Sequence, residues 1–153
     1  MSAEAQTPIQ LIHAVVDSVG ACLLSAHIAE RFGEDTHAYT PAQVTTRDFQ
    51  WMVASSLFVA ILPCDSAGNL IKTDGTHVEL GWASALGRPI IVLAPRQAQH
   101  QLSHLVKGLG TVATVSLLCL EEVMRDDTEL RTLLVKHVQK HESIYEASAQ
   151  RAA

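Results

Sequence analysis

The sequence lacks the features that mark several broad classes of protein. Its longest apolar run, Trp51 to Leu62, is broken by two serines and is much shorter than the roughly 20 residues that a membrane-spanning helix needs. No positively charged start followed by an apolar block indicates a signal peptide. The formal net charge is −5, and no basic stripe of the kind that binds nucleic acid is present. We therefore expect a cytoplasmic protein with no membrane association and no nucleic-acid polymer as a partner.

Cysteine is scarce as well, and its pattern suggests no metal or redox chemistry. The three cysteines have neither metal-ligand nor redox spacing, which is typical of reduced thiols in the cytosol. Two histidine pairs, His100 with His104 and His137 with His141, have a spacing that suits a metal on a helix. Neither pair has a thiol ligand nearby in sequence. We therefore expect no metal site and no cofactor.

Length and composition set the scale of the molecule. A chain of 153 residues suits one domain with one sizeable core, which we expect to span residues 1–153. Hydrophobic residues make up 48% of the chain and charged residues only 18%. Buried strands and a subunit interface would together account for this apolar balance. We expect a homodimer or a higher homo-oligomer.

Apolar periodicity predicts strands that alternate with helices. A helical pattern over residues 8–18 ends at Gly20 and is followed by a short apolar run, residues 21–26, which predicts a strand. The other predicted elements are strands at 57–62, 90–94 and 112–120, and helices at about 40–55, 76–86, 98–107 and 127–145. This alternation predicts a parallel sheet covered by helices on both faces, with ligands beyond the carboxyl ends of the strands.

One helix start has both a structural and a chemical interpretation. Thr76 is expected to cap a helix that runs to Leu86, and Glu79 would complete a capping box by bonding back to the cap backbone. In the chemical interpretation, free N–H groups and the helix dipole keep Glu79 ionised, which suits a nucleophile or a group that stabilises a cation. Gly75 would let the backbone approach a ligand.

Two further residues are candidates for chemistry. Asp48, on the preceding predicted helix, is either a solvated charge beside Arg47 or a functional carboxylate. His27 follows the first predicted strand and could act as a general acid or base, although a lone histidine near a strand end is more often only hydrogen-bonded. His27 and the start of the Glu79 helix are both expected at the edge where the carboxyl ends of the strands meet.

The string DGTHVELGWASALGRPIIVL, residues 74–93, closely resembles the signature of the nucleoside 2-deoxyribosyltransferase-like superfamily, above all its CMP and hydroxymethyl-CMP N-glycosidases. Shorter segments follow the same branch in the same order over about residues 9–120: SAH at 25–27, RFG at 31–33, TPA at 40–42, RD at 47–48, FVA at 58–60 and LVKGL at 105–109. The resemblance implies a flavodoxin-like or Rossmann-like three-layer sandwich with a mostly parallel sheet of four to five strands. The first strand of the family, with its phosphate loop, has no counterpart here.

The resemblance also implies an activity. Members of the family break the bond between C1′ of a sugar and a base nitrogen, through an oxocarbenium-like transition state of the kind found in glycoside hydrolysis. By resemblance, Glu79 is the catalytic carboxylate, acting as nucleophile or cation stabiliser. Asp48 orients the sugar or assists proton transfer, and His27 is a pocket histidine. The substrate would be a pyrimidine nucleoside 5′-monophosphate or a nucleoside.

The same resemblance assigns substrate-binding residues and leaves alternatives open. Thr73, Gly75, Thr76 and Trp82 are expected to contact the substrate. A catalytically silent nucleotide-binding module or partner subunit is one alternative, favoured by the missing strand and by Asp74, which would repel a 5′-phosphate. A nucleoside deoxyribosyltransferase is another. Relatives complete their pockets across subunits, so the resemblance also implies at least a homodimer.

Overall fold

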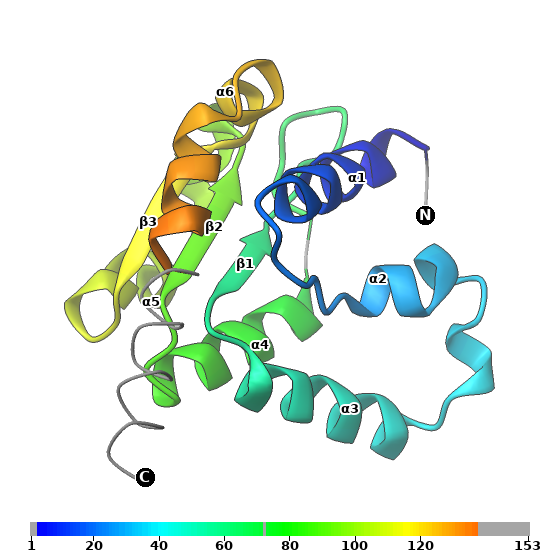
Figure 1. Ribbon diagram of the computed structural model, residues 1–153. Coiled ribbons are helices and arrows are strands. Elements are labelled where there is room, and N and C mark those ends of the chain that lie inside the picture. Colours follow the sequence, from blue (N-terminus) through cyan, green and yellow to red (C-terminus); the bar gives the residue numbers. More distant parts are fainter. Residues whose placement is uncertain (1–2, 72, 138–153) are drawn as a thin grey trace, which may run out of the picture.

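The computed structural model describes residues 3–71 and 73–137, and it is an α/β structure (Figure 1). The strands of its sheet are β1 (Phe58–Ile61), β2 (Ile90–Ala94) and β3 (Val115–Cys119), in the spatial order β1-β2-β3. Both pairs are parallel, with Ile90 of β2 opposite Phe58 of β1 and Val115 of β3. A three-stranded sheet with a central β2 therefore forms the frame of the described part of the chain.

Helices precede and follow each strand. Those with individually defined bounds are α1 (Ala3–Ser18), α2 (Ala26–Ala29), α3 (Pro41–Ala54), α4 (Asp74–Ala85), α5 (His104–Gly108) and α6 (Leu120–Arg125). Residues 128–137 are also helical. Among these residues, no helix is long and apolar enough to cross a membrane.

The core lies on both faces of β2, whose five residues are all buried. Ile91 and Leu93 pack in a cluster with buried residues of α1, α6 and the helix at 128–137. Ile90 and Val92 pack on the opposite face with buried residues of α3 and α4. A continuous apolar strand is what burial on both faces requires. The predicted three-layer α/β sandwich is confirmed, and Figure 1 shows α1 and α3 on different sides of the sheet.

The start of α3 follows its predicted capping signal. The Thr40 side chain accepts a hydrogen bond from the Gln43 amide at 3.3 Å, and the Gln43 side chain accepts one from the Thr40 amide at 2.8 Å. Pro41 occupies the first turn, where its missing N–H costs nothing. This reciprocal capping fixes the helix that carries Asp48, while Met52 anchors its last turns in the core.

The strand predicted at residues 21–26 does not form, so the described sheet has three strands, fewer than the four to five expected. Residues 21–25 are irregular, and Ser25 is extended and caps α2. Burial still alternates along the segment: Ala21 and Leu23 are half-buried, whereas Leu24 is 42% exposed. Alternation marks a segment with one covered face, but a strand also needs a neighbour to complete its ladder. None of the described strands lies beside this segment.

Candidate functional site

Two carboxyl groups from neighbouring helices form the centre of the candidate site. Asp48 lies on α3 and Glu79 on α4. The two helices pack together, and the rings of Phe49 and Trp82 meet edge to face with their centroids 5.3 Å apart. Asp48 is close enough for its charge to act on Glu79. The structure thus brings together two of the residues that the sequence singled out from separate segments.

Glu79 is half-buried, and the pKa of its carboxyl group is raised from 4.5 to about 7. Burial is the largest cause because it penalises the charged form, and the negative charge of Asp48 adds to the effect. The positive charge of Arg47 acts in the opposite direction. With this pKa, roughly half of the Glu79 carboxyls carry a proton at neutral pH. The expectation that a helix mouth keeps Glu79 ionised is therefore wrong.

The reason lies partly in where α4 begins. Its N-cap is Thr73 rather than Thr76, and Asp74 is already helical, so Glu79 lies in the second turn and forms no capping box with Thr76. The ring of His77 reaches back to the carbonyl of Thr73, with Nδ1 at 2.7 Å from the oxygen. Because the stabilisation of an anion by the helix dipole falls off beyond the first turn, burial dominates the pKa of Glu79.

Asp48 is not a solvated surface charge but part of a partly buried ion-pair cluster. Arg47 donates from Nε to Oδ1 of Asp48 at 2.9 Å and from Nη2 to Oε1 of Glu30 at 2.6 Å. The guanidinium carbon lies 5.4 Å from the ring centroid of Tyr39 and 4.9 Å from that of Trp51. Burial alone would lower the pKa of Arg47, but the bonds to the two carboxylates raise it. The arginine is therefore a permanent cation within the site.

His27 belongs to the same region, one residue into α2. Ser25 caps this short helix by accepting a hydrogen bond from the amide of Ile28 at 3.5 Å. Burial lowers the pKa of His27, while the negative charges of Glu30 and Asp48 act against that shift. His27 is thus a mainly neutral imidazole at pH 7, within electrostatic reach of Asp48.

Several solved structures resemble this fold, and two of them are described below. BlsM, known from a solution structure, matches with a TM-score of 0.67 and 30% sequence identity, over 91% of this chain and 82% of BlsM. The CMP N-glycosidase BcmB of Clostridium botulinum matches with a TM-score of 0.59 and 24% identity, over 78% of this chain and 88% of BcmB. No protein-family profile and no curated protein matches the chain.

The chain belongs to the family of BlsM. This is the CMP N-glycosidase-like family, the branch of the nucleoside 2-deoxyribosyltransferase-like superfamily that the sequence motifs indicate. Within it, the sequence motif at residues 74–93 corresponds to α4, β2 and the turn between them.

The four expected substrate-binding residues all lie on or beside α4. Thr73 caps the helix, Gly75 and Thr76 lie in its first turn, and Trp82 lies one turn after Glu79. No atom comes within 4 Å of the position that a Cβ on Gly75 would take, so the space beside this glycine is open. Trp82 is half-buried against the core and Phe49. Their contact with substrate stays a prediction.

Three residues of the cluster were missed by the sequence analysis. Trp51 follows Arg47 by four positions on α3, so helical spacing alone could have indicated that their side chains are neighbours. Glu30 and Tyr39 reach the cluster through the irregular segment between α2 and α3, for which the sequence gives no periodic signal. Their positions depend on tertiary packing.

The surface near the site is open rather than enclosed. A shallow hollow of about 360 Å³ runs along α3, where it is lined by Ala42, Gln43, Thr46, Arg47 and Gln50. A second hollow, of about 410 Å³, lies at the carboxyl ends of β2 and β3. Neither of these two hollows is lined by Glu79 or His27.

The histidine pairs with metal-like spacing do not gather further ligands in the described ranges. His100 lies in a short 3-10 helix (Arg96–Gln101) and His104 begins α5, and both are exposed. His137 is helical, and His141 lies outside the described residues. Over residues 3–71 and 73–137, no group of three or more possible metal ligands occurs.

Proposed function

We propose that the protein is an N-glycosidase that hydrolyses the N-glycosidic bond of a pyrimidine nucleoside 5′-monophosphate or nucleoside. The observation that carries this proposal is the pair formed by Glu79, with its raised pKa, and Asp48 beside a fixed cation. Two carboxyl groups with different environments are what glycoside hydrolysis uses. Membership of the CMP N-glycosidase-like family supports the choice of a nucleotide substrate.

In the proposed reaction, the ionised carboxylate of Glu79 faces C1′ as the bond to the base nitrogen breaks. The base leaves with the bonding electrons and takes up a proton, while the sugar carbon becomes cationic and then receives a water molecule. Asp48, held by Arg47, orients the sugar or assists proton transfer. The neutral His27, within electrostatic reach of Asp48, serves as a hydrogen-bonding group for the substrate.

The direct test is to incubate the protein with CMP, dCMP, cytidine and their uracil and purine counterparts, and to detect free base by chromatography. The proposal expects release from at least one pyrimidine substrate. Adding a second base separates hydrolysis from deoxyribosyl transfer, because transfer produces a new nucleoside. If the protein binds these nucleotides in calorimetry but releases base from none of them, the N-glycosidase proposal fails.

That outcome would favour a silent nucleotide-binding module. The observation behind this second candidate is the openness of the site, since Glu79 lines neither of the two hollows described above. Exposed Asp74 at the start of α4 would also oppose a 5′-phosphate there. Rapid base release by the isolated protein would eliminate this candidate.

A second copy of the chain could cover this open side, and we propose a homodimer. Phe49 and Val53 on α3 are 42% and 46% exposed, and Val78 and Leu86 on α4 are 51% and 37% exposed. Each pair shares one helix face, and Glu79 immediately follows Val78. Apolar side chains gathered on two neighbouring helices are typical of an interface between subunits. These four exposed apolar residues form a stripe that borders the site. A second copy bound to the stripe would therefore narrow the access of substrate to Glu79.

Light scattering at micromolar concentration tests the homodimer. The parent protein is expected to scatter as a dimer, and Val53→Lys as a monomer, because the substitution places a charge in the apolar stripe. Leu105→Lys is the matched control: Leu105 is 86% exposed on α5, which contributes no residue to the stripe, and its substitution should leave the dimer intact. A monomeric parent would contradict the proposal.

A further inference from the structure

Arg47 joins three separate parts of the chain at the site. It lies on α3 next to Asp48, and it bonds to Glu30 at the end of α2. Its guanidinium lies over the ring of Tyr39, from the segment before α3, and over that of Trp51 on α3 itself. The side chains of Arg47, Glu30 and Asp48 are only 18%, 12% and 14% exposed. The guanidinium is therefore held on several sides at once.

This arrangement differs from an ordinary surface ion pair. Adjacent residues on a helix do not face each other, so the bond from Arg47 to Asp48 requires the two side chains to bend toward one another. The two rings and Glu30 supply the contacts that hold it there. Only a planar guanidinium can stack on rings and donate to two carboxylates together, and lysine cannot reproduce that geometry.

The cluster is also incompletely satisfied as a purely structural element. Nη1 of Arg47 is buried and has no hydrogen-bond partner among the described residues. Buried donors in structural ion pairs are normally bonded, and leaving one unbonded costs free energy. The placement of the Arg47 side chain is therefore better explained by its effect on the neighbouring carboxyl groups than by a contribution to folding.

We propose that Arg47 is a positioning residue that holds the carboxylate of Asp48 in place beside Glu79, so that the two carboxyl groups divide the work of the reaction. The part that Arg47 plays in catalysis rests on the proposed function. Its effect on the charges around Asp48 and Glu79 does not depend on that function. Arg47 bonds to Asp48, and its positive charge also acts on Glu79.

The electrostatic consequence follows from the charges that face Glu79. From α3, Asp48 raises the pKa of Glu79 and Arg47 lowers it. Near the end of α2, Glu30 raises the pKa of Arg47, and the charges of Glu30 and Asp48 both act on His27. Removing the cation leaves Glu79 facing the negative charge of Asp48 without compensation. The pKa of Glu79 must then rise further.

The test combines two variants. Arg47→Met removes the positive charge. Arg47→Lys keeps the charge but loses the planar group that donates to two carboxylates and lies against the rings. Carbon-13 NMR titration of the side-chain carboxyl of Glu79 is the first readout. In Arg47→Met, the pKa of Glu79 is expected to rise because the charge that lowers it is gone, and in Arg47→Lys it is expected to stay near that of the parent. Parent and Arg47→Met titration curves that coincide would overturn the proposal.

Base release is the second readout. Displacement of a catalytic group by about 1 Å can cost on the order of 100-fold in rate. We therefore expect kcat/KM at pH 7 to fall about 100-fold in Arg47→Met, with its acid limb moved to higher pH, and by a smaller factor in Arg47→Lys. If Arg47→Met fails to fold, Arg47→Lys decides: activity and titration both equal to those of the parent would overturn the positioning role.

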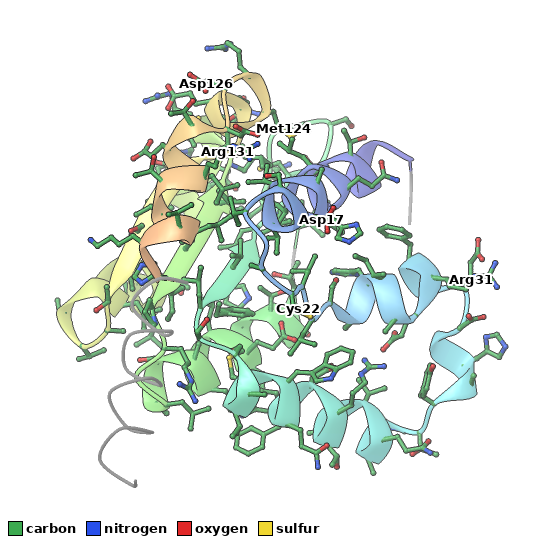
Figure 2. The ribbon with its side chains drawn as sticks, viewed as in Figure 1. Asp17, Cys22, Arg31, Met124, Asp126 and Arg131 are labelled. Carbon is green, nitrogen blue, oxygen red and sulfur yellow. The ribbon has the colours of Figure 1, made fainter. Side chains whose placement is uncertain are left out.

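Arg131→Met is the matched control. Arg131 bonds to Asp127 through Nε and Nη2 at 3.2 and 2.9 Å, so it also forms a forked arginine–aspartate pair. It lies near α6, at the opposite end of the molecule from α3 (Figure 2). Its substitution should leave both readouts unchanged. Because the NMR titration needs no turnover, a parent that releases no base would refute the proposed function while the test of Arg47 still stands.

Discussion

Replacing Glu79 with glutamine is expected to slow base release by about a thousandfold or more, as removal of other catalytic nucleophiles does. Glutamine has nearly the same shape but cannot become an anion, so it loses the stabilisation of the developing positive charge at C1′ while the packing between α3 and α4 is kept. Release measured by chromatography at pH 8 checks the effect. A variant as active as the parent would remove Glu79 from the reaction.

The same substitution should make the folded protein more stable at alkaline pH. The pKa of Glu79 is about 7 in the folded protein, above its ordinary value of 4.5. Between these two pH values the folded state holds a proton that the unfolded state has lost, so the free energy of unfolding falls as pH rises through this window. With solvent screening taken into account, the loss is about 1–2 kcal/mol above pH 7. Glutamine avoids this loss.

Urea unfolding followed by circular dichroism measures this difference in the free energy of unfolding. Glu79→Gln should exceed the parent by about 1–2 kcal/mol at pH 8, and the difference should shrink toward pH 4.5. Glu129→Gln, at an exposed position in the helix at residues 128–137, is the control and should show no such pH dependence. A Glu79→Gln protein that is less stable than the parent at pH 8 would contradict a costly buried carboxylate.

The pH dependence of the reaction is the second large effect that we expect. Only the ionised form of Glu79 can face a cation, so kcat/KM should rise about tenfold per pH unit up to pH 7 and then level off. At pH 5 the reaction should therefore be about 100-fold slower than at pH 8. The lowered pKa of His27 places its own titration on the acid side of neutrality.

Rates of base release from pH 5 to 9 check the profile. In Asp48→Asn the acid limb is expected to move to lower pH, because the charge that raises the pKa of Glu79 is gone. Only the position of the limb matters in this comparison, since Asp48 also has a role in the reaction. A rate that falls as pH rises through 7 would make Glu79 a proton donor and would contradict the assigned role.

The sequence predicts the layers of the fold and the helices that carry the site better than it predicts the electrostatics between them. Apolar runs and capping signals are local, which is why β2 and the Thr40–Gln43 start of α3 form as expected. The run at residues 21–26 has the alternation of a strand, but none of the described strands pairs with it. Strand formation depends on that partner, which periodicity does not reveal.

The start of α4 shows a similar limit. Thr76 is the predicted cap of this helix, three residues before Glu79. The helix begins at Asp74 instead, where an acid in the first turn and the contact between His77 and Thr73 stabilise it. This shift places Glu79 deeper in the helix, and its pKa then depends on burial and on Asp48.

Carbon-13 NMR titration of the Glu79 carboxyl in the parent protein and in Asp48→Asn tests the central claim most directly, because it measures the buried carboxyl pair without requiring a substrate. The account predicts a titration midpoint at about pH 7 in the parent and a lower midpoint when the negative charge at position 48 is removed. A parent midpoint near the ordinary value of 4.5, unchanged in Asp48→Asn, would contradict it.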